Sequence, residues 1–394
     1  MKDFCLPNYK DGSIVNLMSS IGGVFGWKSK YNELSLLKSE EIKKSKNVVL
    51  IVLDGLGYNY LMKNGKNTIF QNHLRGAMTS VYLPTTAAAV TTFLTGVPSQ
   101  QHAFTAWFMN LKETGTVTKI LPFNPRIGGP SLTENGVDIK DILSELAFTS
   151  KINAKSFILN PESVAGSDFT NLMAKKATKF DFKDENLDDF FKKIKKIIKS
   201  SVQKKYIYAY WNQFDKFSHV KGNESKQAEK HFKKLNKELK KFIKSIEGTD
   251  TLLLITADHG FVDTPLSNAI NIKDHPVFKE CLTLPLCGEG RTPFCYVHPS
   301  KAKKFENYVK TKMKKYCYIF KSEDLIKKNY FGLFKPHKKL FDRLGDYVLI
   351  CKKNYVIQDG LSRSTKSKHP PNLGHHGGIS SDEILVPLIT INID

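Results

Sequence analysis

Short, continuous apolar runs recur along the chain and predict buried β-strands. The run VVLIVL at 48–53 is the clearest of them, and it ends at Asp54. A run that is apolar at every position suits a central strand of a mainly parallel sheet, because both faces of such a sheet are covered. Similar runs lie at 205–211, 251–256, 347–351 and 384–391.

Longer segments between these runs carry apolar residues three or four positions apart, which is the spacing of an amphipathic helix. In 224–246 this stripe consists of Ala228, Phe232, Leu235, Leu239, Phe242 and Ile246. Residues 13–27 predict a shorter helix of the same kind. Strands that alternate with helices predict an α/β fold, with a mainly parallel central sheet and helices on both faces.

The pattern changes between residues 268 and 345. There the sequence predicts a strand at 291–298, a helix at 300–315 and a strand at 316–320. We expect a small α+β insertion, a cap-like subdomain at 268–345, because apolar runs typical of the core resume at 347. The remaining residues, 1–267 and 346–394, are expected to form the core, and the Pro- and Gly-containing segment 359–374 a loop.

The composition, 41% hydrophobic and 25% charged residues, is ordinary for a globular protein and excludes disordered and fibrous classes. Every apolar run is far shorter than the roughly 20 residues of a membrane-spanning helix. The N-terminus lacks the apolar region of a secretory signal. We therefore expect a cytoplasmic protein without a membrane span; the sequence leaves its oligomeric state open.

The formal net charge of +22 raises the question of an anionic partner. Of the 60 cationic side chains only five are arginines, the residue whose planar fork reads base edges in DNA grooves. The lysines gather on the polar faces of predicted helices such as 188–203 and 224–246. We interpret them as a solvated surface and expect no specific nucleic-acid binding.

Aspartates and histidines stand next to the ends of several predicted strands, where parallel sheets place their ligand sites. They are Asp54, Asp215, His219, Asp258, His259, His375 and His376. Carboxylate and imidazole ligands suit zinc or a similar divalent ion, and this set is too large for one tetrahedral site. The sequence thus predicts two metal ions about 4 Å apart, the clamp of phosphoryl-transfer enzymes.

Each of these motifs also has an ordinary structural explanation. Asp54-Gly after a strand is typical of a turn, Asp215 with His219 of an exposed helical pair, and Asp258-His259 of a cap. The hypothesis of a metal site therefore depends on all the motifs occurring together at strand ends.

A threonine pair lies at the start of a predicted helix. In LPTTAAAVTTFLTG, residues 83–96, Pro84 ends an extended segment and Gly96 closes the helix, so Thr85 or Thr86 lies at its N-terminus. Free backbone N–H groups and the helix dipole favour an anion there, and a hydroxyl could attack phosphorus. The alternative is that both threonines only cap the helix.

In order, the motifs VVLIVLDG, PTTAAAVTTFLTG, D-x-x-x-H, ADHG and GHHGG resemble the alkaline phosphatase superfamily. They are most similar to its type I phosphodiesterase/nucleotide pyrophosphatase branch, over about 45–265 and 340–394. The resemblance implies an alkaline-phosphatase-like fold, a threonine nucleophile and two metal ions, usually zinc. It selects Thr86 by its spacing from Thr95-Gly96, and His376 because the family's ligand directly precedes the glycine. One metal would be held by Asp54, Thr86, Asp258 and His259, the other by Asp215, His219 and His376.

The chain also departs from the branch. Alanines follow Thr86, and Trp107 stands where many members carry a phosphate-binding asparagine, with Asn110 three residues later. The expected function is a phosphodiesterase/nucleotide pyrophosphatase-type hydrolase acting on a small phosphodiester or nucleotide-like substrate. The alternatives are a phosphomonoesterase at the same site and a non-catalytic phosphate-recognising protein. Activity is expected to fall in acid as the histidines are protonated.

Overall fold

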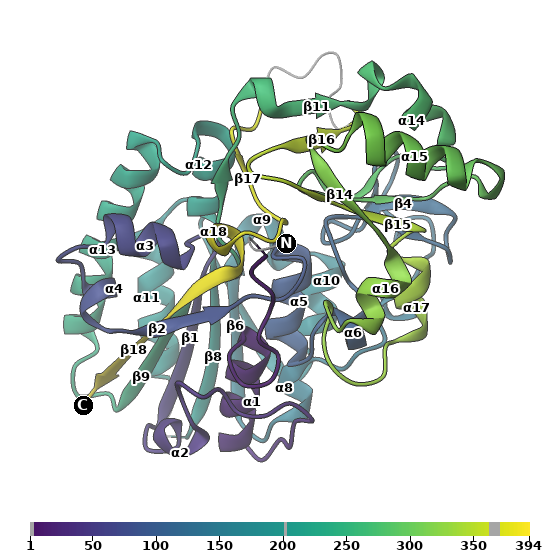
Figure 1. The fold of residues 1–394 in the computed structure, drawn as a ribbon. Helices are drawn as coiled ribbons and strands as arrows, with labels where there is room; N and C mark the ends of the chain where they lie inside the picture. Colours follow the sequence, from purple (N-terminus) through teal and green to yellow (C-terminus); the bar gives the residue numbers. More distant parts are fainter. Residues whose placement is uncertain (1–3, 201–202, 362–370) are drawn as a thin grey trace.

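The computed structural model describes residues 4–200, 203–361 and 371–394 (Figure 1). Its largest element is a seven-stranded sheet with the order β2-β18-β9-β1-β8-β6-β7. The bounds are β1 Asn47–Leu53, β2 Leu74–Thr79, β6 Lys155–Pro161, β7 Ala177–Phe182, β8 Lys205–Trp211, β9 Thr251–Thr256 and β18 Leu385–Ile393. Strands β9, β1, β8, β6 and β7 run parallel, while β18 is antiparallel to both of its neighbours.

Helices cover both faces of this sheet because side chains alternate along its buried strands. Tyr206 and Tyr208 of β8 face α5 (Thr86–Thr95) and α8 (Phe148–Lys151), with the Phe148 and Tyr206 rings 5.3 Å apart. Trp211 faces the other way, 5.3 Å from the Phe190 ring of α11 (Leu187–Ile198).

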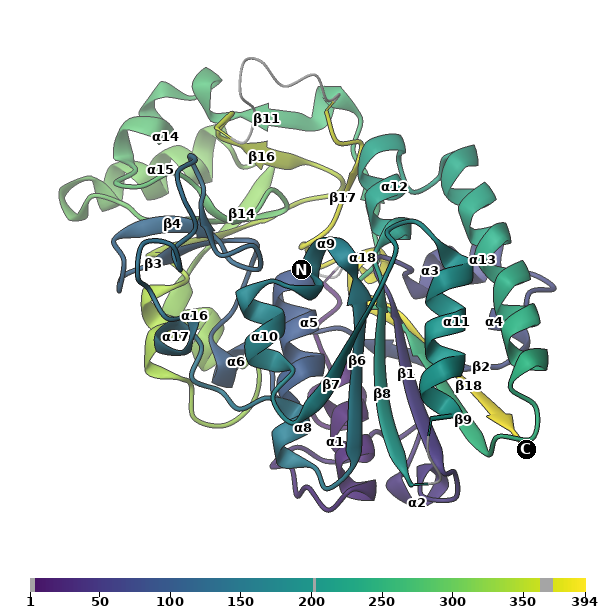
Figure 2. The same cartoon turned by 180° about the vertical axis from the view of Figure 1, so that it is seen from behind.

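Figures 1 and 2 show the helices on the two faces of the large sheet from opposite sides. Helix α1 (Ile14–Val24) lies in front of the sheet in Figure 1, and α11 lies in front of it in Figure 2. Helix α13 (Lys226–Ser245) packs against α11. The predicted α/β fold with a mainly parallel sheet is confirmed.

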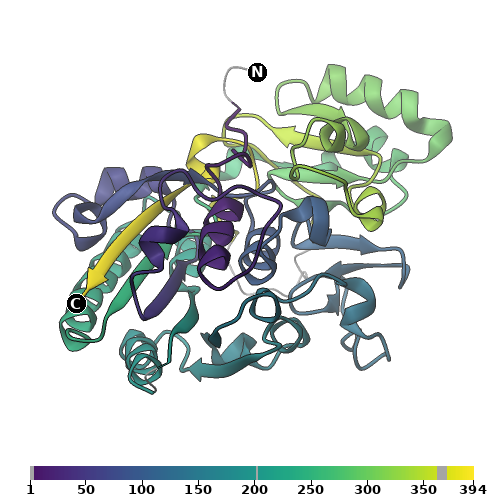
Figure 3. The same cartoon turned by 90° about the horizontal axis from the view of Figure 1, so that it is seen from below.

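A second seven-stranded sheet, entirely antiparallel, lies beside the first (Figure 3). Its order is β14-β15-β13-β12-β3-β4-β5. The bounds are β3 Phe108–Leu111, β4 Thr116–Lys119, β5 Asn124–Pro125, β12 Cys287–Glu289, β13 Thr292–Cys295, β14 Cys317–Lys321 and β15 Tyr347–Cys351.

Strand β15 corrects the sequence analysis, which placed the apolar run 347–351 in the large sheet. It pairs with β13 and β14 instead and separates the two strands that α15 (Ala302–Lys312) connects. Any central strand of a sheet that is covered on both faces needs the same all-apolar pattern. The pattern therefore indicates that the strand is buried, but it does not indicate which strands pair with it. The second sheet therefore takes strands from 108–125 and 347–351, outside the predicted limits 268–345.

Further short elements are α12 Gln213–Lys221, β10 Val262–Asp263 paired with β17 Gly374–His375, β11 Ala269–Asn271 paired with β16 Val356–Gln358, and α18 Ser381–Ile384. The remaining helices are α2 Ser39–Ile42, α3 Tyr58–Asn64, α4 Ile69–Asn72, α6 Ser99–His102, α7 Ile139–Ile142, α9 Glu162–Ala165, α10 Asp168–Met173, α14 Pro276–Cys281, α16 Ser322–Lys327 and α17 Lys338–Asp342. Residues 362–370 of the predicted loop lie outside the described residues. Every helix in the described part of the chain is too short or too polar to span a bilayer.

Candidate active site

Helix α5 brings Thr86 to the edge of the large sheet. The helix begins at Thr86, with the extended Thr85 as its N-cap residue, and ends at Gly96, whose φ of 78° is the left-handed conformation that glycine tolerates. The Thr86 hydroxyl lies 3.3 Å from Nε2 of His259. The Thr85 side chain does not cap the helix, because its hydroxyl donates to Oε1 of Glu289 at 2.6 Å. The two threonines therefore point to different partners.

Three aspartates converge on the same place from neighbouring parallel strands. Asp54 follows β1, Asp258 follows β9, and Asp215 lies in the first turn of α12 after β8. The backbone N–H groups of Gly55 and His259 both donate to Oδ1 of Asp258, at 3.0 Å each, which fixes that carboxylate. The Tyr210 hydroxyl donates to Oδ2 of Asp54. Each of these two aspartates thus keeps one oxygen for a further partner.

The histidines present Nε2 to these carboxylates. Nδ1 of His259 lies 3.2 Å from the Gly260 carbonyl, and Nδ1 of His219 lies 2.9 Å from the Gly374 carbonyl. A carbonyl only accepts, so Nδ1 of His259 carries the proton and its Nε2 carries the lone pair. Nδ1 of His219 also lies 3.3 Å from the amide nitrogen of Asn372, and its shorter contact with the carbonyl favours the same tautomer. This orientation by a backbone carbonyl is typical of histidines that ligate metals.

Asp215 is the common neighbour of three imidazoles. Its Oδ1 lies 3.4 Å from Nε2 of His219, 3.9 Å from Nε2 of His376 and 4.0 Å from Nε2 of His259. The His259 and His376 rings stack with centroids 3.8 Å apart. His375 lies outside this group, with Nε2 at 3.2 Å from the Asn372 carbonyl. The structure therefore brings His376, and not His375, to the carboxylates.

Burial of like charges shifts the pKa values in this group. Burial raises the pKa of Asp215 and of Asp258 to about 7, and burial together with the Asp215 charge raises the pKa of Asp54. Burial lowers the pKa of His219 to about 4 and that of His376 well below its usual range. Without metal, protons would therefore be taken up in mild acid by the carboxylates and not by His219 or His376.

These residues fit two divalent ions. Oδ1 of Asp54, Oδ1 of Asp215 and Oδ2 of Asp258 are buried and have no hydrogen-bond partner, an arrangement that costs free energy unless a cation satisfies them. The possible ligand atoms form two groups within 4.8 Å: Asp54, Asp258 and His259, and Asp215, His259 and His376. All seven residues selected by the resemblance therefore lie together, with His259 shared by the two groups and His219 beside Asp215.

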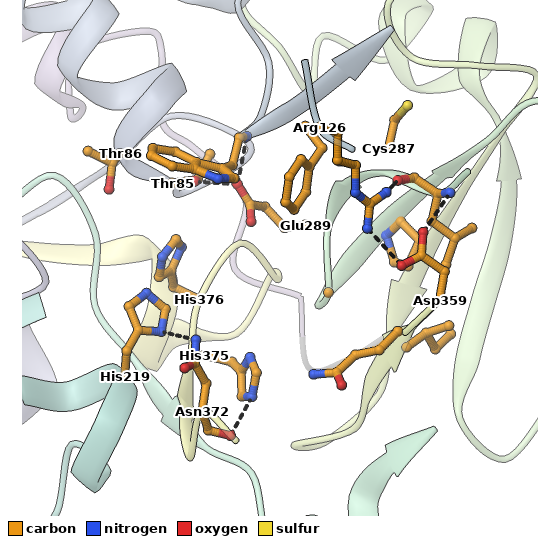
Figure 4. A pocket seen from close by; sticks show the side chains of 18 of the residues that line it. Thr85, Thr86, Arg126, His219, Cys287, Glu289, Asp359, Asn372, His375 and His376 are labelled. Atoms are coloured by element: carbon orange, nitrogen blue, oxygen red, sulfur yellow. Dashed lines mark hydrogen bonds and ion pairs between the residues drawn. The ribbon is translucent and has the colours of Figure 1, made fainter. Parts of the chain in front are cut away.

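A cavity of about 570 Å³ opens above this group (Figure 4). Thr86, Asp215, His219 and His376 line one end. Three charged residues that the sequence analysis missed also line it: Glu289, Arg126 and Asp359. None of them belongs to a sequence motif, and only the fold carries them to the cavity: Glu289 ends β12, whereas Arg126 and Asp359 directly follow β5 and β16.

The missed residues are held in place by hydrogen bonds. Arg126 donates to the Leu286 carbonyl and, at 2.7 Å, to Oδ1 of Asp359, and its guanidinium lies 4.1 Å from the centre of the Phe108 ring. Oε1 of Glu289 accepts from the Thr85 hydroxyl and, at 2.8 Å, from the backbone N–H of Trp107. Trp107 thus lines the cavity beside Glu289, whereas Asn110 does not line it.

The fold and this group of residues define a hydrolase of the alkaline phosphatase superfamily. The chain belongs to the type I phosphodiesterase/nucleotide pyrophosphatase family, whose model matches residues 48–378. It is by class a phosphoester hydrolase, and the resemblance stated from the motifs is confirmed. A comparison with curated protein sequences finds no match.

Solved structures share the fold at low sequence identity. Murine ectonucleotide pyrophosphatase/phosphodiesterase 5 is 16% identical, with a TM-score of 0.65 over 86% of this chain and 87% of that chain. Its inactive variant, in which alanine replaces a threonine, is known in complex with AMP and matches over the same shares, with the same identity and TM-score. Phosphonoacetate hydrolase from Sinorhizobium meliloti 1021 in complex with phosphonoformate is 15% identical, with a TM-score of 0.64 over 88% of this chain and 90% of that chain.

Proposed function

We propose that the protein is a metal-dependent phosphodiesterase of nucleotide pyrophosphatase type with Thr86 as its nucleophile. The observation that carries the proposal is the position of the Thr86 hydroxyl, at the N-terminus of α5 and 3.3 Å from Nε2 of His259. His259 is the residue common to both groups of possible metal ligands. The inactive threonine-to-alanine variant of the murine relative supports a threonine in this role.

Two divalent ions complete the proposed site. We propose zinc, because carboxylate and imidazole ligands suit this metal. Asp54, Thr86, Asp258 and His259 would hold one ion, and Asp215, His219 and His376 the other. When bound, such ions lower the pKa of a ligating hydroxyl and neutralise charge on phosphoryl oxygens.

The protein's own groups determine the course of the proposed reaction. The phosphoryl group lies at the first turn of α5, where free backbone N–H groups and the helix dipole favour an anion. Thr86 Oγ1, having lost its proton to solvent, forms a bond to phosphorus while the bond from phosphorus to the leaving oxygen breaks, and the leaving alcohol takes up a proton. The intermediate is a phosphodiester of Thr86 that keeps the second alcohol of the substrate. Water then hydrolyses it, which releases the phosphomonoester and restores the hydroxyl.

The cavity supports a small, monoanionic diester as substrate. A phosphomonoester site usually grips the dianion with additional cations, often arginine. Among the described residues that line the cavity, Arg126 is the only lysine or arginine, and it is ion-paired with Asp359. Phe108 and Trp107 line the cavity and offer aromatic surfaces. The AMP complex of the murine relative supports a nucleotide-like group there.

The test uses the protein loaded with zinc and, separately, treated with a chelator. We expect turnover of bis(para-nitrophenyl) phosphate that exceeds turnover of para-nitrophenyl phosphate, is abolished by the chelator and returns with zinc. Mass spectrometry after rapid acid quench of the diester reaction should find a para-nitrophenyl phosphoryl group on Thr86. Turnover that is indifferent to the chelator, or an adduct at another residue and not at Thr86, would contradict the proposal.

A further inference from the structure

Strand β12 of the second sheet brings a carboxylate, that of Glu289, to the wall of the cavity. Figure 4 shows it beside Thr85, on the side of the cavity opposite His219. Donors from two separate segments hold Oε1: the Thr85 hydroxyl at 2.6 Å and the Trp107 N–H at 2.8 Å. A carboxylate held at one oxygen by two donors has little freedom to turn away from a bound substrate.

The loop that carries His376 closes over the same carboxylate. A Cβ atom on Gly377 would lie 2.7 Å from Cγ of Glu289, and Gly377 has a φ of 94°, so a glycine is required for this approach. Glu289 therefore lies between the Thr85–Thr86 end of α5 and the His376 loop, adjacent to the place where the phosphoryl group would bind.

The charge balance of the cavity depends on this residue. While Thr86 is still a neutral hydroxyl, two divalent ions would exceed the three buried aspartates by one positive charge, and ionised Glu289 offsets that charge. Among the described residues that line the cavity, the charges of Arg126 and Asp359 offset each other in an ion pair. The cavity as a whole thus suits a substrate with the smallest negative charge.

We propose that Glu289 is a specificity-determining residue that disfavours phosphate monoesters relative to diesters. The inference rests on the proposed function. A monoester dianion presents one more charged terminal oxygen than a diester, in which that oxygen is esterified. A fixed carboxylate beside the phosphoryl group repels this additional charge in the monoester, whereas an esterified oxygen carries no charge to repel.

If Glu289 only positioned Thr85, loss of its charge would not by itself change the preference between monoesters and diesters. Two variants separate this structural role from charge selection. Glu289→Gln removes the charge but keeps the oxygen that accepts from Thr85 and Trp107. Thr85→Val removes the donor but keeps the charge. Only charge selection predicts that the first variant changes the preference between substrates and the second does not.

The experiment compares kcat/KM for para-nitrophenyl phosphate and bis(para-nitrophenyl) phosphate in wild type and both variants, all loaded with zinc. Calorimetry measures the binding of inorganic phosphate to the same proteins. Burial raises the pKa of Glu289, so the assays are repeated at several pH values up to about 9, which favours the ionised carboxyl. Glu224→Gln, the same change at an exposed residue that pairs with Lys63 outside this cavity, is the matched control. Glu289→Ala is the second charge-free variant if Glu289→Gln does not fold.

In Glu289→Gln we expect the monoester-to-diester ratio to rise about tenfold and phosphate to bind about tenfold more tightly. Thr85→Val, in which the Trp107 N–H still holds Oε1 and the charge remains, should change the ratio far less than Glu289→Gln, and Glu224→Gln should keep the wild-type ratio. An unchanged ratio or an unchanged phosphate affinity in Glu289→Gln would overturn the inference, as would the same change in Thr85→Val. Absence of diester turnover in wild type would instead overturn the proposed function, while the phosphate affinities would still decide the role of Glu289.

Discussion

Nε2 of His259 lies 3.3 Å from the Thr86 hydroxyl and 3.3 Å from Oδ1 of Asp54. One imidazole therefore connects the start of α5 with the carboxylate that follows β1. Its Nδ1 is turned to the Gly260 carbonyl, so the lone pair of Nε2 points into this group of oxygens. The arrangement places the proposed nucleophile and the proposed metal ligands within reach of one another.

Thr86→Ala should lower diester turnover by at least about 10³-fold, because it removes the attacking oxygen and leaves the rest of the cavity intact. Thr86→Ser should retain part of the activity, since it keeps the hydroxyl and loses only a methyl group. Steady-state kinetics on one diester provide the measurement. Thr85→Val is the control at the neighbouring residue and should stay active. If Thr85→Val were inactive and Thr86→Ala active, the nucleophile would be Thr85 and not Thr86.

Asp215→Asn should abolish turnover and reduce the bound metal, because Oδ1 of Asp215 faces three imidazoles and has no other partner. The metal-free variant should be at least as stable as metal-free wild type, since the substitution removes one of three buried like charges. Elemental analysis and thermal unfolding measure both effects. Asp382→Asn is the control, at an exposed carboxylate that accepts a hydrogen bond from Asn59. It should change neither the turnover nor the amount of bound metal. Full zinc content in Asp215→Asn would rule this residue out as a ligand.

Stabilisation by zinc should grow as the pH rises from about 5.5 to about 8. Burial raises the pKa of Asp215 and of Asp258 to about 7 in the folded metal-free protein. Proton binding to these two carboxyls therefore stabilises the folded state at low pH, and this stabilisation is lost as the pH rises through about 7. Below that pH the protons on these carboxyls also compete with the metal. His219, with a pKa lowered to about 4, stays neutral across this range and adds no pH dependence.

The measurement is the difference in melting temperature with and without zinc at several pH values. Calorimetry in buffers of different ionisation enthalpy should show protons released on zinc binding below about pH 7 and few above it. A zinc effect that is constant, or largest in acid, would mean that the carboxylates do not titrate in this range.

Arg291→Met should destabilise the protein by about 3–5 kcal/mol, because it leaves Glu383 buried without its partner. Arg291 donates to both oxygens of Glu383, at 3.0 and 2.9 Å, and the two side chains are 1% and 0% exposed. Glu383 also accepts from the N–H of Gly378 at 2.7 Å, so the loop of His376 should loosen and zinc affinity should fall.

Denaturant unfolding and zinc titration of Arg291→Met test this prediction. The double variant Arg291→Met/Glu383→Leu removes both charges and should recover part of the lost stability. If the single variant unfolded like wild type, the pair would contribute little to holding the loop.

Residues next to strong local patterns were predictable from the sequence. Asp54 and Asp258 each follow an apolar run that became a parallel strand, and the carboxyl ends of such strands meet at one edge. Thr86 lies between a proline-terminated segment and an alanine-rich helix, and the structure starts α5 at this residue. The choice of Thr86 over Thr85, and of His376 over His375, came only from the family resemblance, and the contacts of these residues agree with it.

Apolar spacing in the sequence predicted the buried strands β1, β8 and β9, the helix α13 and the polar residues that follow those strands, because such spacing acts over a few positions of the chain. Only the tertiary structure decided that Tyr347–Cys351 pairs within the second sheet and that Glu289 reaches the cavity. The same holds for the pairing of Arg126 with Asp359 and for the lowered pKa of His219. These properties depend on contacts between residues far apart in the chain and on the loss of water around them, and no local pattern encodes either.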